Sequence, residues 1–230
     1  MSESAVTVNW PSEISVELHR EIVTKADQLG KNAFTGWQDC SIAYNSLTVF
    51  YDPWVVRQSY SMAPREFVFQ WLEKWLAEPT AMTTAPIGKE HLLPVCYDVS
   101  LAPDLEAVAL HTNLSPTELI GLHSSQVYTV FMVGFSPGFP YLGILPPELE
   151  TPRKANPALK VPPGSVAIAA RQTGIYPTAT SGGWNIIGRT PVKVFDPSHP
   201  ADCLLKTGDT VRFSPIDTAT FAYLNQYENC

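Results

Sequence analysis

The residues whose side chains could take part in a reaction lie between His123 and Arg189. Eight of the 13 glycines lie between positions 134 and 188, and twelve of the 21 prolines lie between positions 137 and 200. Proline lacks a backbone donor and glycine allows backbone angles that other residues avoid, so this segment predicts irregular β structure with loops. Loops on a β scaffold present polar side chains without burying them, and we therefore expect a functional site here.

Three residues of this segment are candidate catalytic residues: His123, Gln172 and Tyr176. An imidazole titrates near neutral pH, so His123 is the candidate for proton transfer. His123 ends a predicted short helix, and a histidine that binds the last carbonyl groups of that helix is the alternative. Gln172 and Tyr176 follow an apolar strand, where their polar groups suit a binding rim and a turn equally well.

The remaining candidates would bind a substrate. Arg153 and Arg189 suit anionic groups, because a guanidinium donates two parallel hydrogen bonds to a carboxylate or phosphate. The rings of Phe139 and Trp184 could form the walls of a pocket, or they could fill an irregular core. Hydroxyl or backbone N–H donors complete the set: Thr173, Gly182 and Gly183.

The sequence contains no recognisable metal or phosphate-binding motif. The five histidines show no i, i+4 pairing, and the four cysteines form no Cys-x-x-Cys pair. The phosphate-loop, nucleophile-elbow and His-Glu-x-x-His patterns are also absent. We therefore predict no metal site, and any ATP used by this protein would not be bound by the usual phosphate loop.

Composition and charge exclude several classes of protein. The 230 residues include 15 Lys+Arg and 22 Asp+Glu, a formal net charge of −7, without a basic cluster. Nucleic-acid binding depends on phosphate neutralisation, so nucleic acid is not an expected partner. No apolar run is long enough to span a bilayer, and the first residues lack the features of a signal peptide. We expect a cytoplasmic protein without membrane contact.

The first part of the chain predicts a small α+β domain. Strand patterns alternate with helical patterns in the order β-α-β-β-α-β, which is typical of a ferredoxin-like domain. A turn at Asn45 and Ser46 joins two of the strands, and Ala63 and Pro64 begin the second helix. The last strand is predicted at residues 92–97, so the domain spans residues 1–98. A Thr, Ala and Pro-rich stretch at residues 79–88 is the best linker candidate.

The second predicted domain, residues 99–230, begins with two short helices and continues as strands. Ser115, Pro116 and Glu118 fit the capping box of the second helix. The clearest strand patterns cover residues 127–135, 161–170, 192–195 and 210–213.

Four ordered motifs resemble the KipI family, which is also known as the family of the 5-oxoprolinase B subunit or as allophanate hydrolase subunit 1-like. They are FMVGFSPGFPYLG at residues 131–143, PRK at 152–154, GSVAIA with QTGIYP at 164–177, and GGW to IIGRTP at 182–191. The looser two-domain pattern extends the resemblance to nearly the whole chain. It implies a ferredoxin-like domain followed by a cyclophilin-like β-barrel, in agreement with the element order above.

The resemblance also implies an activity and partners. Members open 5-oxo-L-proline to L-glutamate with ATP hydrolysis. They do so together with a C subunit, which resembles biotin-dependent carboxyltransferases, and an A subunit, which is of the LamB/YcsF type. ATP would activate the lactam, and a partner would bind it or share it. The alternatives are a regulatory module that inhibits a sensor histidine kinase and a component of a urea carboxylase or allophanate hydrolase-like system.

Overall fold

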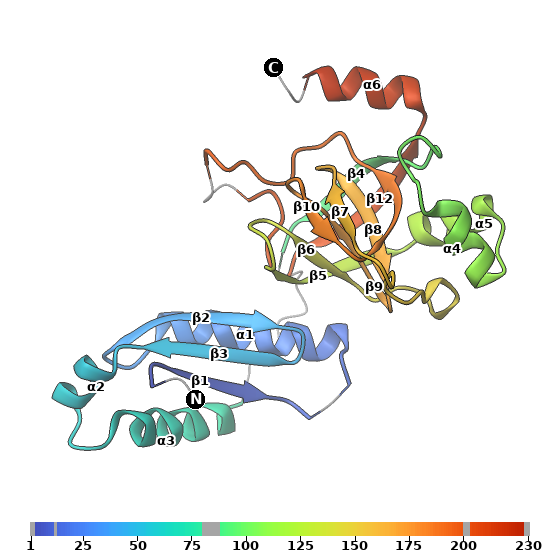
Figure 1. Cartoon of the computed structure of the whole chain (residues 1–230). Coiled ribbons are helices and arrows are strands. Elements are labelled where there is room, and N and C mark those ends of the chain that lie inside the picture. Colours follow the sequence, from blue (N-terminus) through green and yellow to red (C-terminus); the bar gives the residue numbers. More distant parts are fainter. Residues whose placement is uncertain (1–2, 12, 80–87, 200–202, 228–230) are drawn as a thin grey trace. The chain divides into compact units, whose positions relative to one another are not determined.

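The computed structural model describes residues 3–11, 13–79, 88–199 and 203–227 (Figure 1). The chain folds into two compact units, Met1–Ile87 and Gly88–Cys230, which we call the N-terminal unit and the barrel unit. Most of the predicted linker, residues 80–87, lies outside the described residues. No helix of the described residues is long and apolar enough to cross a membrane.

The N-terminal unit is an antiparallel sheet in the order β1-β3-β2 with helices packed against it. Ser15 caps the first helix by accepting from the Leu18 backbone N–H, and Ile22 and Leu29 on this helix are fully buried. The bounds are β1 (Ala5–Asn9), α1 (Val16–Lys31), β2 (Trp37–Ala43), β3 (Ser46–Tyr51), α2 (Pro53–Ser59) and α3 (Pro64–Ala77). The predicted hairpin and both predicted helices are confirmed, whereas α2 was not predicted.

The ferredoxin-like prediction is not confirmed, because its last strand lies elsewhere. The predicted strand at residues 92–97 is β4 (Glu90–Cys96), which pairs in parallel with β12 (Thr210–Ile216) in the barrel unit. The side chains of Leu93 and Val95 are buried in the barrel core. Among the described residues the N-terminal sheet has three strands. The division between the units thus precedes β4, whereas the predicted boundary followed residue 98.

The barrel unit contains a closed barrel in the strand order β11-β4-β12-β5-β6-β9-β8. This confirms a β-barrel as the main element of the second part of the chain. Its interior is filled by apolar side chains such as Tyr128, Ile168 and Phe213. The remaining barrel strands are β5 (Val127–Val133), β6 (Pro140–Gly143), β8 (Ser165–Ala169), β9 (Gln172–Ile175) and β11 (Asn185–Arg189).

The strand predicted at residues 161–170 is divided into β7 (Ala158–Val161) and β8. Pro162 and Pro163 lack the donors that a continuous strand needs, and Gly164 has φ 78°, where a Cβ would collide with the Thr190 carbonyl. β7 instead pairs with β10 (Thr180–Gly182) in a separate two-stranded ribbon. Residues 192–195 form no strand, so that prediction is wrong.

Two helices, α4 and α5, lie together beside the barrel, whereas α6 lies apart from them near the C-terminal end (Figure 1). The capping box predicted for the second of them is confirmed, since Ser115 Oγ accepts from the Glu118 N–H and Glu118 accepts from the Ser115 N–H at 2.8 Å. The bounds are α4 (Leu105–Thr112), α5 (Pro116–Ser125), the short 3₁₀ helix η1 (Pro147–Leu149) and α6 (Thr218–Tyr227).

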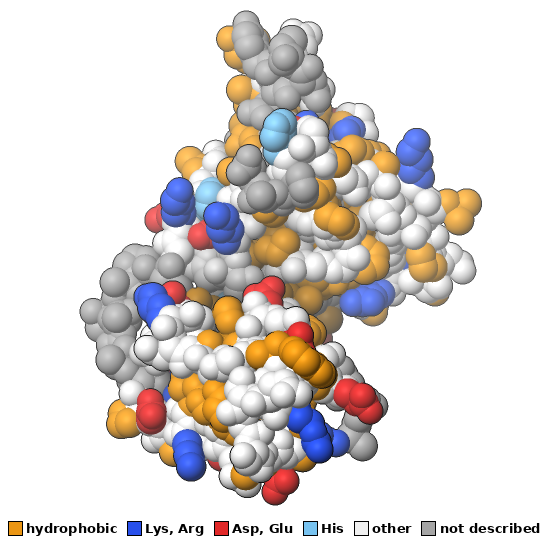
Figure 2. Space-filling view, turned by 90° about the vertical axis from the view of Figure 1, so that its left-hand side faces the viewer, with side chains coloured by type: hydrophobic (Ala, Val, Ile, Leu, Met, Phe, Trp, Pro, Cys, Tyr) orange, Lys and Arg blue, Asp and Glu red, His pale blue; other side chains and the backbone are white. Residues whose placement is uncertain are grey.

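Charged side chains are interspersed on the face of the molecule that Figure 2 shows, where lysine and arginine lie among acidic and apolar side chains. Among the described side chains visible there, neither unit taken by itself shows a continuous basic stripe of the kind that follows a nucleic-acid backbone.

Candidate functional site

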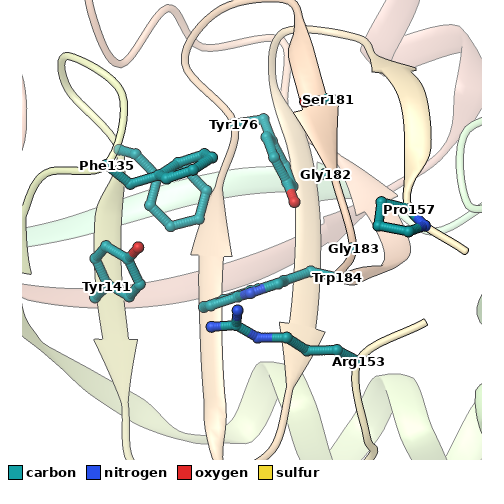
Figure 3. A pocket seen from close by; sticks show the side chains of 10 residues that line it. Phe135, Tyr141, Arg153, Pro157, Tyr176, Ser181, Gly182, Gly183 and Trp184 are labelled. Carbon is teal, nitrogen blue, oxygen red and sulfur yellow. The ribbon is translucent and has the colours of Figure 1, made fainter. Parts of the chain in front are cut away.

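An open cavity of about 230 Å³ lies on the barrel unit between the β7–β10 ribbon and the loop that precedes β6 (Figure 3). It could hold roughly eight water molecules at about 30 Å³ each, which is the size of a small metabolite. We call it the Tyr176 cavity. Its lining residues are Phe135, Phe139, Tyr141, Arg153, Pro157, Tyr176, Ser181, Gly182, Gly183 and Trp184.

Aromatic rings form the apolar walls of the Tyr176 cavity. The buried ring of Phe139 lies at the centre and contacts Tyr141, Tyr176 and Trp184 edge to face, with ring centroids 4.9, 5.2 and 5.4 Å away. Such packing fixes the rings relative to one another. Phe135 lies 5.9 Å from Phe139 and is 71% exposed, so it forms part of the rim.

A tight loop positions the side chains of Phe135 and Phe139 at the Tyr176 cavity. The Gly134 N–H donates to the Phe139 carbonyl at 3.0 Å, and the Phe139 N–H donates to the Ser136 carbonyl at 3.0 Å. Gly138 has φ 79°, and a Cβ at this position would lie 2.6 Å from Cγ of Phe195. The loop therefore needs glycine at this position, both for its backbone angle and for its close approach to a ring.

Three polar groups point toward the middle of the Tyr176 cavity: the hydroxyls of Tyr141 and Tyr176 and the guanidinium of Arg153 (Figure 3). Burial raises the pKa of both tyrosines. The positive charge of Arg153 opposes this shift for Tyr141, and a hydrogen bond from the Trp184 backbone N–H, followed by the charge of Arg153, opposes it for Tyr176. Both hydroxyls are therefore protonated at neutral pH and can donate. Arg153 has no ion-pair partner among the described residues, which leaves its guanidinium available to an anion.

The chain segment that carries Arg153 is fixed by the next residue. The Lys154 N–H donates to the Gly183 carbonyl at 2.8 Å, and its ammonium forms an ion pair with Asp104 at 2.8 Å. The same Asp104 oxygen accepts from the Ile186 N–H at 2.7 Å. Arg153 is thus held against β11, while Lys154 has a structural role.

Gly182 and Gly183 offer a matched test of the cavity wall. A Cβ on Gly182 would overlap the Tyr176 hydroxyl and lie 2.7 Å from its Cζ, whereas a Cβ on Gly183 would meet only Pro157 Cγ at 3.6 Å. We expect Gly182→Ala to displace the Tyr176 ring and lower the affinity for a cavity ligand about tenfold or more. Gly183→Ala should bind as the wild type does. Equal affinities for the two variants, measured by calorimetry, would contradict this role of Tyr176.

His123 lies in the barrel interior and does not line the cavity. It is fully buried and stacks on Phe213 with centroids 4.8 Å apart. Its Nε2 lies 3.0 Å from Oγ1 of Thr173, and its Nδ1 lies 2.8 Å from the Tyr97 hydroxyl. Burial lowers the pKa of His123 to about 3, so the ring is neutral at physiological pH.

The hydrogen-bond network assigns the tautomer of His123. Thr173 Oγ1 donates to the Ala167 carbonyl at 3.1 Å, so this hydroxyl accepts from His123 Nε2–H. Nδ1 then accepts from the Tyr97 hydroxyl. Tyr128 donates to the His123 carbonyl at 2.9 Å. His123 and Thr173, which were expected to transfer a proton and to contact the substrate, thus bind each other and further buried groups of the barrel, and neither lines the Tyr176 cavity.

Gln172 and Arg189 also lie outside the Tyr176 cavity. Gln172 begins β9 and pairs with Ala169 at the end of β8. Arg189 ends β11 and lines a separate small cavity. Of the predicted set, the structure brings together Phe139, Arg153, Tyr176, Gly182, Gly183 and Trp184.

Four lining residues are absent from the predicted set: Phe135, Tyr141, Pro157 and Ser181. The alternation of glycine and aromatic residues in GFSPGFPYLG is a signal for Phe135 and Tyr141. Ser181 directly precedes the Gly182–Gly183 pair, which is its signal in the sequence. Pro157 carries no local signal, because it reaches the cavity through the pairing of β7 with β10.

Comparison with known proteins identifies the family. The family model described as carboxyltransferase domain, subdomain C and D, matches residues 1–205, and the chain belongs to this family. Among its relatives, the B subunit of the 5-oxoprolinase of Bacillus subtilis (strain 168) is 36% identical over 233 residues, covering 100% of this chain and 96% of that protein. The protein of the same name from Haemophilus influenzae is 39% identical over 214 residues, covering 93% of this chain and 94% of that protein.

Solved structures share this fold. The crystal structure of TTHA0988 is 32% identical with a TM-score of 0.76, covering 93% of this chain. This chain spans 40% of the TTHA0988 chain. The urea carboxylase of Kluyveromyces lactis is 15% identical with a TM-score of 0.73, covering 98% of this chain and 22% of that enzyme. At that identity the likeness concerns the fold alone.

Proposed function

We propose that this chain is the B subunit of an ATP-dependent 5-oxoprolinase, an amide hydrolase that opens 5-oxo-L-proline to L-glutamate. Two full-length relatives that are named as the B subunit of this enzyme support the assignment. The enzyme would be active only with its two other subunits, one of the LamB/YcsF type and one that is carboxyltransferase-like. We assign the barrel to the cyclophilin-like type and the complex to the cytoplasm.

The main support for this proposal is that the Tyr176 cavity combines a guanidinium, aromatic rings and hydroxyl groups. The substrate is a small ring with one carboxylate and one lactam group. Arg153 can bind the carboxylate through its guanidinium fork, and the rings of Phe139 and Trp184 can contact the apolar faces of the substrate ring. The tyrosine hydroxyls of the same lining can then donate to the lactam carbonyl oxygen.

The chain's own residues would bind and orient the substrate. The Tyr176 hydroxyl, kept protonated by burial, would donate to the lactam oxygen as negative charge develops there. The half-enclosed aromatic walls would exclude bulk water from the ring faces. Fixing the carboxylate at Arg153 would set the direction in which the lactam carbon faces a partner protein. The buried His123 has no step in this account.

ATP supplies the activation of the lactam, but the Tyr176 cavity does not fit it. A volume of about 230 Å³ is below the roughly 300–1,000 Å³ of sites for larger ligands. The described residues contain no group of three or more side chains that could hold a metal ion with a triphosphate. We therefore assign ATP to one of the partner proteins.

Tyr176→Phe tests the binding mode in the assembled complex. Removing a donor to the lactam oxygen should lower kcat/KM for 5-oxoproline about tenfold, because the hydrogen bond strengthens as charge develops on that oxygen. Tyr223→Phe on α6 removes a hydroxyl from a half-exposed tyrosine outside the cavity and should leave kcat/KM unchanged. The rate of glutamate release, measured at varied 5-oxoproline concentrations, gives kcat and KM for each complex. A Tyr176→Phe complex as active as the wild type would reject this role.

A further inference from the structure

The barrel unit has a second cavity, of about 110 Å³, that shares no lining residue with the Tyr176 cavity. β11 connects the two, since Trp184 directly precedes this strand and Arg189 ends it. Apolar side chains form most of the second cavity, and its polar side chains are Ser100, Ser165 and Arg189. We call it the Arg189 cavity.

The guanidinium of Arg189 is only partly satisfied by the protein. Its Nε donates to the Pro163 carbonyl at 2.9 Å, and this bond fixes the plane of the guanidinium. The side chain has no other hydrogen bond and no ion pair among the described residues. The N–H groups of both terminal nitrogens are therefore available to a ligand.

The positive charge of Arg189 is also unbalanced. Burial alone lowers the pKa of this guanidinium, with no opposing contribution from a nearby carboxylate. Neither acidic residue next to the lining segments forms an ion pair with Arg189: Asp104 binds Lys154 and the Ile186 N–H, and Asp98 accepts from the N–H and hydroxyl of Ser100 in the cavity lining. Arg189 is partly buried beside the cavity, and its unbonded terminal N–H groups can pair with a counter-ion from outside the chain.

We propose that the Arg189 cavity binds one small oxyanion, a carboxylate or phosphate group, at a site separate from the Tyr176 cavity. A volume of about 110 Å³ corresponds to roughly four water molecules at about 30 Å³ each, which accommodates one such group but not a nucleotide. A guanidinium whose Nε is already bonded presents its terminal N–H groups to two oxygens of the anion. Ser165, which is buried in the same lining, supplies a hydroxyl next to the anion. This site goes beyond the proposed function and does not depend on it.

The direct test is titration of the full chain with inorganic phosphate and, separately, with acetate, in a buffer free of other oxyanions. Calorimetry should show saturable binding of at least one of them, and the one that binds identifies the anion as phosphate or carboxylate. Arg189→Gln should weaken this binding about tenfold or more, because a charge-assisted pair is lost. Arg171→Gln removes the same charge from an exposed arginine outside both cavities and should bind as the wild type does.

Two results would overturn the proposal: an absence of saturable binding by the wild type, and equal weakening by Arg189→Gln and Arg171→Gln. If Arg189→Gln does not fold, Arg189→Lys answers the question, because it keeps the charge and loses the fork. The anion should then raise the unfolding temperature of the wild type more than that of Arg189→Lys. An equal rise in the two proteins would remove Arg189 from the site. None of these readings requires turnover, so a failure of the 5-oxoprolinase assignment would leave them intact.

Discussion

Arg153→Gln should lower kcat/KM for 5-oxoproline about a hundredfold in the assembled complex. Arg153 carries the one side-chain charge in the lining of the Tyr176 cavity. Among the described residues it has no ion-pair partner, so no carboxylate of the protein competes with the substrate carboxylate. Loss of a charge-assisted pair of this kind corresponds to roughly 2.8 kcal/mol of binding free energy. The effect should appear mostly in KM, because the carboxylate is bound equally in the substrate and in the transition state.

A matched variant separates this local effect from a change in net charge. Lys160→Gln removes a positive charge from an exposed residue on β7, outside the cavity, and should keep wild-type kinetics. Arg153→Lys should recover only part of the activity, since an ammonium cannot form the two parallel bonds of a guanidinium. If Arg153→Gln stays within about threefold of the wild type, the carboxylate binds elsewhere.

Acidification should destabilise the barrel unit through His123. Burial lowers the pKa of this imidazole from 6.5 to about 3 in the folded state. The unfolded chain therefore binds more protons than the folded chain between these two values, and the free energy of unfolding falls as the pH drops below 6.5. A single group of this kind contributes a slope of at most about 1.4 kcal/mol per pH unit. Urea unfolding followed by circular dichroism between pH 7.5 and pH 5 measures the slope, since most carboxylates remain ionised in this window.

His123→Gln is the informative variant for the pH dependence. It should be less stable than the wild type at pH 7, because the hydroxyls of Tyr97 and Thr173 lose the imidazole nitrogens to which they are hydrogen-bonded. Its free energy of unfolding should then change little from pH 6.5 to pH 5. His111→Gln, at an exposed position near the end of α4, should keep the wild-type slope. A His123→Gln slope as steep as that of the wild type would mean that another group takes up the proton.

The elements that local patterns define were predictable from the sequence. The β2–β3 hairpin and the capped helix α5 each depend on a few neighbouring residues, such as Ser115 and Glu118. The assignment of β4 was not predictable in this way. Its pattern fits a strand in either unit, and the parallel pairing of Glu90 with Thr210 depends on residues far apart in the sequence.

The candidate site was predictable where one loop supplies several residues. The Gly-Phe-Ser-Pro-Gly-Phe run and the Gly182–Trp184 segment both reach the Tyr176 cavity. Residue type alone could not place His123 or Arg189. His123 ends a helix whose inner face packs on the barrel, so its ring enters the core. Arg189 lies five residues after Trp184, where the course of β11 takes it to another cavity.

We propose that this chain is an obligatory subunit of a 5-oxoprolinase. The most direct measurement is ATP-dependent release of glutamate from 5-oxoproline by the purified chain alone, by the two partner proteins together, and by all three. We expect glutamate release only in the complete mixture. Equal release when this chain is omitted, with both partners shown to be folded, would contradict the account.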